Sequence, residues 1–218
     1  MSQTTGPAKP TGSTTSRTVL ARAPLGRWRS VDLVTAAVLG VAFGVVFWGW
    51  GVLYHVIDPA FAAFRPAAGL VSGVWLLPAV VGALVVRRPG AALLTEMLAA
   101  TVEMLLGSAW ASGVLVSGAI QGLGVEIAVA LFLWRRWSLG VAVLGGVLAG
   151  VLEALYENVV YYGGEWAPAW QAAYVGLFAL SGAVVAGLGG WALVRALART
   201  GALQRFPAGA EHRARARA

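Results

Sequence analysis

Six apolar segments of about 20 residues each follow one another between residues 33 and 194. A helix needs about that length to cross a bilayer, where every backbone polar group must be satisfied within the protein. Only 11% of the residues are charged, against about 25% in an ordinary soluble domain. The sequence therefore predicts an all-α integral membrane protein with six transmembrane helices. The predicted helices are Leu33–Tyr54, Pro66–Val86, Pro89–Gly107, Trp110–Trp134, Trp137–Val160 and Ala169–Val194.

The flanking segments differ from the apolar ones in composition. Residues 1–30 are rich in Thr, Ser, Pro, Gly and Arg and show no apolar periodicity, which is typical of disorder. We therefore expect a disordered cytoplasmic tail over residues 1–30, a six-helix domain over 31–197 and a basic cytoplasmic tail over 198–218. Pro78 is expected to kink the second helix, because proline removes a backbone N–H and crowds the preceding turn.

The arginines predict the orientation of the chain. They lie before the first helix, between the second and third, between the fourth and fifth, and after the sixth. Of the 16 Lys and Arg residues, only Arg65 falls on the opposite side of the membrane in this arrangement. Because short loops rich in Lys and Arg stay in the cytoplasm, we expect both termini inside, in a multi-pass protein of the bacterial plasma membrane.

Residue types that the chain lacks exclude several classes of function. There is no cysteine, and neither of the two histidines belongs to an H-E-x-x-H pair, so a zinc-protease site is excluded. Lys9 is the only lysine and no G-x-x-x-x-G-K-[ST] loop is present, so the chain cannot itself be a P-loop ATPase. The net charge of +7 comes from short arginine clusters between apolar runs, which argues against a nucleic-acid partner. We expect no enzymatic activity and no resident cofactor.

Carboxylates inside the predicted helices are the most informative feature. A charge at the bilayer centre costs at least about 2.5–3.5 kcal/mol, so such residues normally face a cavity or a partner. No Lys or Arg lies in the middle of any span to neutralise them. Some must be protonated, hydrogen-bonded, hydrated or paired with something that arrives from outside. The five carboxylates are Glu96, Glu103, Glu126, Glu153 and Glu157.

Helical geometry sorts these residues by depth. At a rise of about 1.5 Å per residue, Glu103, Glu153 and Glu157 fall in the outer half of the membrane. Glu96 and Glu126 fall toward the inner half, and Gln121 lies between the two levels. Carboxylates, an amide and aromatic faces at one level suit an aromatic, cationic ligand. The aromatic residues expected in the outer half are Trp48, Trp50, Tyr54, Trp110, Tyr156, Tyr161, Tyr162, Trp166 and Trp170.

Simpler explanations stay open for several of these residues. Aromatic residues near helix ends often form an interfacial belt, and Glu157 could reach the outer headgroups. For Glu96 and Glu126, a hydrogen bond between helices is as good an explanation as ligand contact. For Glu103 and Glu153 we favour ligand binding.

Small residues recur at every fourth position on three helices. The stripes are Ala36, Gly40 and Gly44; Gly146, Gly150 and Ala154; and Gly182, Ala186 and Gly190. Such stripes let helix backbones approach closely in lipid. Packing within the bundle is the ordinary explanation for any one of them. A docking surface for another membrane protein is the alternative, and the stripe on the first helix, Ala36, Gly40 and Gly44, is the candidate.

Two blocks of sequence carry a family resemblance. The run Arg87-Arg88-Pro89-Gly90-Ala91-Ala92 continues through Glu96 and Val102-Glu103 to Leu106-Gly107, and Ile120-Gln121-Gly122-Leu123-Gly124-Val125-Glu126 follows. With the ending Arg199-Thr200-Gly201-Ala202-Leu203, these resemble the YkoE family, substrate-binding S components of energy-coupling factor (ECF) vitamin transporters. The resemblance covers most of residues 31–209 and is weaker in the fifth helix.

The resemblance implies a six-helix S component that binds thiamine or its hydroxymethylpyrimidine precursor from outside. It would associate with a transmembrane coupling (T) protein and cytoplasmic ATPase subunits. Glu96, Glu103, Gln121 and Glu126 match family positions, and so does Trp75. Ligand contact by Glu153, Glu157 and Tyr161 is predicted from depth and chemistry alone. The alternatives are a stand-alone proton-coupled carrier of a small cationic solute and a membrane scaffold without transport activity.

Overall fold

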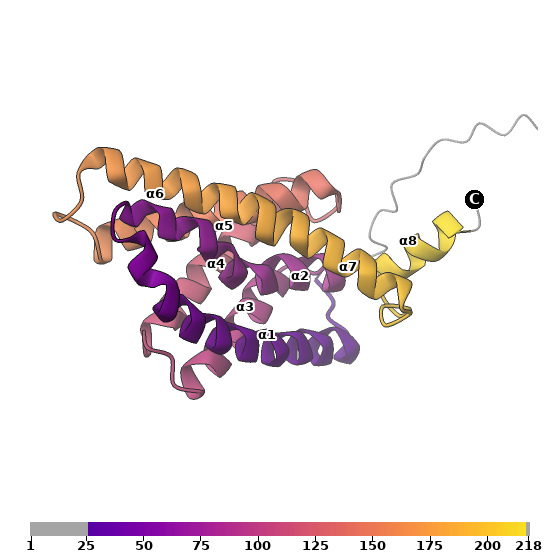
Figure 1. The fold of residues 1–218 in the computed structure, drawn as a ribbon. Coiled ribbons are helices and arrows are strands. Elements are labelled where there is room, and N and C mark those ends of the chain that lie inside the picture. The colour runs from indigo at the N-terminus through magenta and orange to yellow at the C-terminus, as the bar shows by residue number, and fades with distance from the viewer. Residues whose placement is uncertain (1–25, 217–218) are drawn as a thin grey trace, which may run out of the picture.

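The protein is a bundle of helices, seen here in a computed structural model that describes residues 26–216 (Figure 1). Within that range it contains helices, turns and connections but no strand. The structure therefore confirms the predicted all-α class. Of the predicted tail over residues 1–30, only the last five residues lie within the described part of the chain. The helices are α1 (Ser30–Ile57), η1 (Asp58–Phe61), η2 (Arg65–Leu76), α2 (Leu77–Val86), α3 (Ala91–Leu105), α4 (Gly113–Ala130), α5 (Leu139–Val160), α6 (Pro168–Ser181), η3 (Gly182–Gly189), α7 (Gly190–Arg199) and α8 (Pro207–Ala216).

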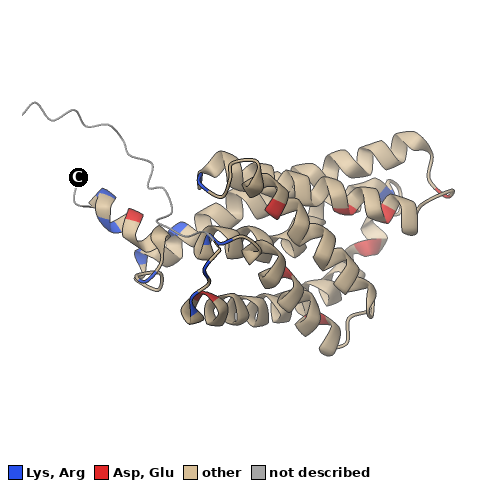
Figure 2. Ribbon diagram, turned by 180° about the vertical axis from the view of Figure 1, so that it is seen from behind, with Lys and Arg blue, Asp and Glu red and all other residues tan. Residues whose placement is uncertain are grey.

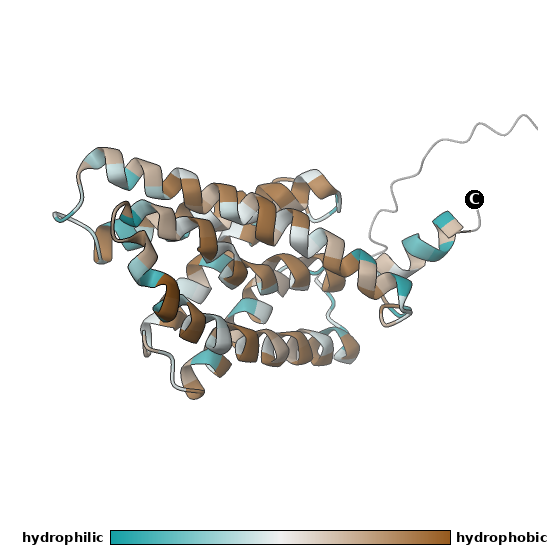
Figure 3. Cartoon of the chain, viewed as in Figure 1, coloured by the Kyte–Doolittle hydropathy of each residue, from teal (hydrophilic) through white to brown (hydrophobic). Residues whose placement is uncertain are grey.

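Between residues 26 and 216, five continuous helical stretches are long and apolar enough to cross a membrane. They are Ser30–Phe61, Arg65–Val86, Gly113–Ala130, Leu139–Val160 and Pro168–Arg199. The remaining predicted segment forms α3, which has 15 residues and a length of about 22 Å. Hydrophobic residues, in brown, predominate along the bundle helices (Figure 3), and many on α1, such as Val34 and Val38, are more than half exposed. This is the pattern expected where lipid is the solvent.

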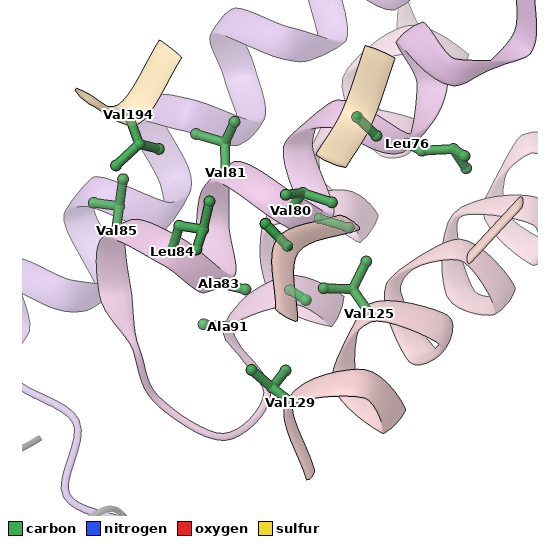
Figure 4. Close-up of a cluster of buried hydrophobic side chains, with 14 of the residues drawn as sticks. Leu76, Val80, Val81, Ala83, Leu84, Val85, Ala91, Val125, Val129 and Val194 are labelled. Atoms are coloured by element: carbon green, nitrogen blue, oxygen red, sulfur yellow. The ribbon is translucent and has the colours of Figure 1, made fainter. Parts of the chain in front are cut away.

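The short helix α2 forms the centre of the bundle. All of its residues from Pro78 to Val86 are buried, packed against α3, α7 and the other neighbouring helices. Figure 4 shows part of this core, in which Val80, Val81 and Leu84 of α2 lie among side chains of α4 and α7. From Pro78 to Val86, α2 therefore has no lipid-facing side and supports the site described below from within the bundle.

Glycines hold α5 against η3, the π-helical middle of the last long helix. A Cβ at Gly146 would collide with the backbone carbonyl of Gly182, and one at Gly150 would collide with that of Phe178. Ala186 is fully buried. These two stripes therefore pack inside the bundle, as the ordinary explanation predicted.

The stripe on α1 also packs inside the bundle, which corrects our docking prediction. A Cβ at Gly40 would meet Leu98 of α3, and a Cβ at Gly44 would meet Val102. Ala36 has no exposed surface. Because α3 already covers Ala36, Gly40 and Gly44, these residues are not free to dock a partner protein. The sequence showed the small-residue face but not which helix occupies it.

Basic residues gather at the end of the bundle that carries α8 (Figure 2). Arg65 begins η2 after the long helix α1 has crossed the bundle from that end. At the basic end, the buried Asp32 of α1 pairs with Arg29 at 2.6 Å and with Arg88 at 3.5 Å. This pairing ties the start of α1 to the connection between α2 and α3. The segment after α7 folds back as well, with Leu203 and Phe206 buried and α8 packed on α7 and α2.

Candidate binding cavity

The site begins with an interruption in the second long helical stretch. The 3₁₀ helix η2 changes into α2 at Leu77, and Pro78 occupies the first turn of α2. Pro78 has no N–H to offer, and the N–H of Ala79 donates to the Glu96 carboxylate at 2.8 Å. The 3₁₀ partner of the Trp75 carbonyl would be the N–H of residue 78, which proline lacks. The predicted kink at Pro78 is therefore a change of helix type that frees backbone groups within the membrane.

Two predicted site residues, Glu96 and Gln121, form hydrogen bonds with these backbone groups. With its amide oriented to suit its neighbours, Gln121 donates to the carbonyl of Trp75 at 2.9 Å and to Glu96 Oε1 at 3.1 Å. Glu96 is fully buried. Interrupted backbone is tolerated at membrane depth only where protein groups or a cavity complete its hydrogen bonds. The bond from Ala79 to Glu96 is thus one between helices, and it also fixes the floor of a cavity.

That cavity has a volume of about 300 Å³ and is bounded by all six long helical stretches and two of their connections. Its size lies at the small end of the range of about 300–1,000 Å³ found for small-molecule sites. Nearly all the predicted site residues surround it. The lining comprises Phe47, Tyr54, Ser72, Trp75, Glu96, Ala100, Glu103, Trp110, Gly113, Val114, Ser117, Gly118, Gln121, Glu153, Glu157, Tyr161, Tyr162, Tyr174 and Phe178.

Glu153 differs from the other carboxylates of the cavity. It is 1% exposed, yet neither of its carboxylate oxygens has a hydrogen-bond partner within residues 26–216. Ser117 and Gln121 of α4 are its polar neighbours, but they lie outside hydrogen-bond geometry with its oxygens. A buried polar group without a partner is costly, and native structures rarely retain one without a functional reason. Glu153 is therefore the group in this cavity most in need of a ligand.

The other two carboxylates of the outer level are already held by neighbours. Glu103, 2% exposed, accepts a hydrogen bond from Ser108 Oγ at 3.3 Å. Glu157 accepts one from the hydroxyl of Tyr174 on α6. These bonds fix the directions of both side chains while leaving them in the lining. Together with Glu96 and Glu153 they make the lining acidic, and no Lys or Arg belongs to it.

Two aromatic groups complete the walls. In the first, the rings of Tyr54 and Trp110 each lie 5.6 Å from that of Trp75. In the second, Tyr174 contacts Tyr162 edge-on at 5.6 Å and Phe178 at 5.5 Å. Such edge-to-face contacts are favourable and hold rings in place. A flat ligand would find aromatic faces as well as carboxylates.

The mouth lies between two connections at the end of the bundle away from α8. Trp110, before α4, and Tyr161, after α5, are 37% and 44% exposed. The Tyr161 hydroxyl lies over the start of α4, where a Cβ at Gly113 would be 3.2 Å from it. Beside Tyr161, burial raises the pKa of Tyr162 to about 12, so its phenol stays neutral. Under the predicted orientation this mouth faces the outside.

Glu126 corrects the predicted site. It lies outside the cavity lining, where its two oxygens accept hydrogen bonds from the backbone N–H of Ala92 at 2.8 Å and from Trp134 Nε1 at 3.1 Å. Ala92 is in the first turn of α3, which begins after Gly90 with its φ of 85°. A carboxylate stabilises the free N–H groups of a helix start. Glu126 therefore caps α3, and ligand contact is the wrong explanation for it.

Sequence reasoning also missed part of the lining and included aromatic residues that are not in it. Tyr174 and Phe178 are four residues apart on α6, and Ser117 is four residues before Gln121 on α4. Residues four apart lie on one face of a helix, so this spacing could have indicated that they belong to the lining. Trp48 and Trp170 are 42% and 37% exposed, as in an interfacial belt. The expected aromatic residues that do not line the cavity are Trp48, Trp50, Tyr156, Trp166 and Trp170.

Comparisons with known proteins agree on the family. The family described as "ABC-type cobalt transport system, permease component" matches residues 31–152. Over 186 residues, the chain is 33% identical to YkoE of Bacillus subtilis (strain 168), a proposed HMP/thiamine permease protein, covering 84% of this chain and 92% of that protein. The chain belongs to the YkoE family. This confirms the family resemblance that the sequence blocks between Arg87 and Glu126 indicated.

The fold of this YkoE-family chain is that of a transporter component. It superposes on a crystal structure of an S component of an ECF transporter with a TM-score of 0.83 and 31% sequence identity. The match covers 88% of this chain and 96% of the other. With its membrane-spanning helices, this YkoE-family member is a multi-pass cell membrane protein resembling ECF S components.

Proposed function

We propose that the protein is the substrate-binding subunit of an ECF-type importer, which captures thiamine or its hydroxymethylpyrimidine precursor from outside. A T protein and cytoplasmic ATPase subunits would release the ligand to the inside. Support comes from the permease name of the Bacillus relative, from the S-component fold and from a sequence without an ATP-binding loop. The predicted orientation, with both termini inside, puts the cavity mouth on the outside.

The observation that carries this proposal is the unpartnered carboxylate of Glu153 in a cavity without Lys or Arg. An aminopyrimidine offers N–H donors to a carboxylate, and the thiazolium of thiamine adds a positive charge. Four glutamates line the cavity, so a cation there gains attraction that increases as water is excluded. The aromatic rings of Trp75 and Tyr161 suit a flat heterocycle and a cation.

We assign a role in ligand binding to each predicted site residue that lines the cavity. Glu153 bonds the amino group, and Glu103 and Glu157 complete the anionic wall. Trp75 and Tyr161 supply aromatic faces, one deep and one at the mouth. Glu96 and Gln121 act from below by holding Trp75 and the adjoining helix ends in position.

A metal ion is less suited to this cavity, although the matched family is described as a cobalt transport permease. Within residues 26–216 no group of three His, Cys, Asp or Glu side chains is placed to hold a metal ion. The chain has no cysteine, and imidazole and thiolate are the ligands that bind such metals best. The chemistry of the lining favours an organic cation.

Calorimetric titration of the detergent-purified protein with thiamine, hydroxymethylpyrimidine and Co²⁺ tests the proposal. We expect submicromolar binding of one of the two organic ligands without added ions, and no binding of Co²⁺. Glu153→Gln should weaken the ligand by at least about tenfold, the effect of losing one hydrogen bond to a charged group. Glu165→Gln, at an exposed position outside the lining, is the matched control.

Two results would overturn the proposal. Proton-driven uptake of either organic ligand by liposomes containing this chain alone would indicate a stand-alone carrier. A folded protein that binds neither ligand would indicate a scaffold. Co-purification with a T protein and ATPase subunits would test the proposed partners.

A further inference from the structure

A second cavity, of about 270 Å³, lies at the basic end of the bundle. It is enclosed by the end of α2, by α7 and by α8, and it shares no lining residue with the acidic cavity. Half of its lining residues are apolar and four are arginines. The lining comprises Leu84, Arg87, Trp191, Val194, Arg195, Ala198, Arg199, Ala208, Glu211, His212, Arg215 and Ala216.

Arg87 anchors this second cavity. It ends α2 in the left-handed conformation with φ 54° and is 3% exposed. Its Nε donates to the carbonyl of Leu84 at 3.1 Å, and its guanidinium lies 5.6 Å from the ring of Trp137. The other two nitrogens bond both oxygens of Glu211 on α8, at 2.5 and 3.0 Å. This bidentate pair holds α8 in place and forms one wall.

Positive charge remains after that pairing. Arg195, Arg199 and Arg215 also line the cavity and are exposed. Among the residues from 26 to 216, none of the three forms an ion pair within 4 Å; the ion pairs found involve Arg29, Arg65, Arg87 and Arg88. Four arginines and one glutamate leave three positive charges around one small volume. Such a concentration of arginine forks suits a phosphate group.

The surface leading to the cavity is apolar. Val184 and Leu188 are 49% and 44% exposed and precede Trp191 and Arg195 at intervals of three or four residues on η3 and α7. One face of this stretch therefore passes from lipid-facing side chains through a tryptophan to arginines. This is the order in which acyl chains, interface and headgroups follow one another in a bilayer.

We propose that this second cavity binds the phosphate group of an anionic phospholipid, with the acyl chains lying along Val184 and Leu188. Arg195, Arg199 and Arg215 hold the phosphate, while Arg87 and Glu211 position α8 over it. Basic pockets between helices at the cytoplasmic side are suited to such headgroups. A free phosphate would use the same arginines but would gain nothing from the apolar face.

The test uses the full chain in neutral detergent, with native mass spectrometry to measure bound lipid. We expect phosphatidylglycerol to bind and phosphatidylcholine not to, at equal concentration. Replacing Arg195, Arg199 and Arg215 together by Gln should weaken phosphatidylglycerol on the order of 100-fold, from about 1 kcal/mol for each arginine near the surface. The control replaces Arg135, Arg136 and Arg213, which are exposed and outside the cavity.

The outcomes separate the possible sources of phosphate. Equal weakening by the control variant would overturn the proposal, because general surface charge would then explain binding. Inorganic phosphate that displaces phosphatidylglycerol at micromolar concentration would assign the site to a soluble anion instead. Should the triple variant fail to fold, Arg199→Gln alone must still weaken phosphatidylglycerol more than Arg213→Gln does. Ligand titration at the acidic cavity reports folding independently.

Discussion

The carboxylate of Glu96 accepts a hydrogen bond from the backbone N–H of Ala79 across two helices, at 2.8 Å. This bond completes the backbone where η2 changes into α2, and it places the floor of the ligand cavity at that change. The sequence analysis left ligand contact and a hydrogen bond between helices open for Glu96, and the structure shows the hydrogen bond at a residue that also lines the cavity. Both consequences can be measured.

Replacing Glu96 should separate these two roles. Glu96→Leu leaves the Ala79 N–H buried without an acceptor, which should lower the free energy of unfolding by about 1–3 kcal/mol. Glu96→Gln keeps an acceptor oxygen, so its free energy of unfolding should fall by less than that of Glu96→Leu. Thermal unfolding in detergent, followed by circular dichroism, measures both variants. Equal stability of Glu96→Leu and the unmodified chain would contradict the assigned bond.

Glu126→Ala should affect stability but not ligand affinity. Its carboxylate caps the start of α3 and lies outside the cavity, so we expect a loss of about 0.5–2 kcal/mol, as for other helix caps. Titration of the folded fraction with the preferred ligand should give an unchanged dissociation constant. A tenfold higher dissociation constant in fully folded protein would indicate instead that Glu126 contributes to ligand binding.

Gly146→Ala tests the contact between α5 and η3. Its Cβ would collide with the carbonyl of Gly182, so we expect the two helices to separate and the protein to lose folding yield. The matched control is Gly176→Ala on α6, where a Cβ would meet nothing within 4 Å. That change should be neutral or stabilising by up to about 1 kcal/mol, from helix propensity. Size-exclusion profiles of detergent extracts compare the two.

Tyr174→Phe removes only the hydroxyl that donates to Glu157. The ring keeps its contacts with Tyr162 and Phe178, so packing should be preserved. A hydrogen bond to a charged group contributes about 1.5–3 kcal/mol, and we expect weaker ligand binding because Glu157 is no longer held in position. Calorimetry compares it with Glu165→Gln, the exposed control outside the lining. If both variants bind alike, the Tyr174 hydroxyl does not position Glu157 for the ligand.

The sequence by itself determined the membrane class, the helical segments and the carboxylates within them that need a partner. These follow from local properties: a run of apolar residues needs a bilayer, and a carboxylate within it needs a partner. The family resemblance could be read from contiguous blocks between Arg87 and Glu126. Glu103, Glu153 and Glu157 were grouped by their expected depth, which follows from the helical rise, and all three line the same cavity.

Only the tertiary structure decided which partner each carboxylate has. Glu96, Glu126 and Glu153 have the same chemistry and similar sequence surroundings, yet one completes an interrupted helix, one caps α3 and one faces a cavity unpartnered. The same holds for the stripe at Gly40 and Gly44, which α3 covers. Rotation and pairing of helices in lipid are set by side-chain packing between segments distant in sequence, and local pattern does not contain that information.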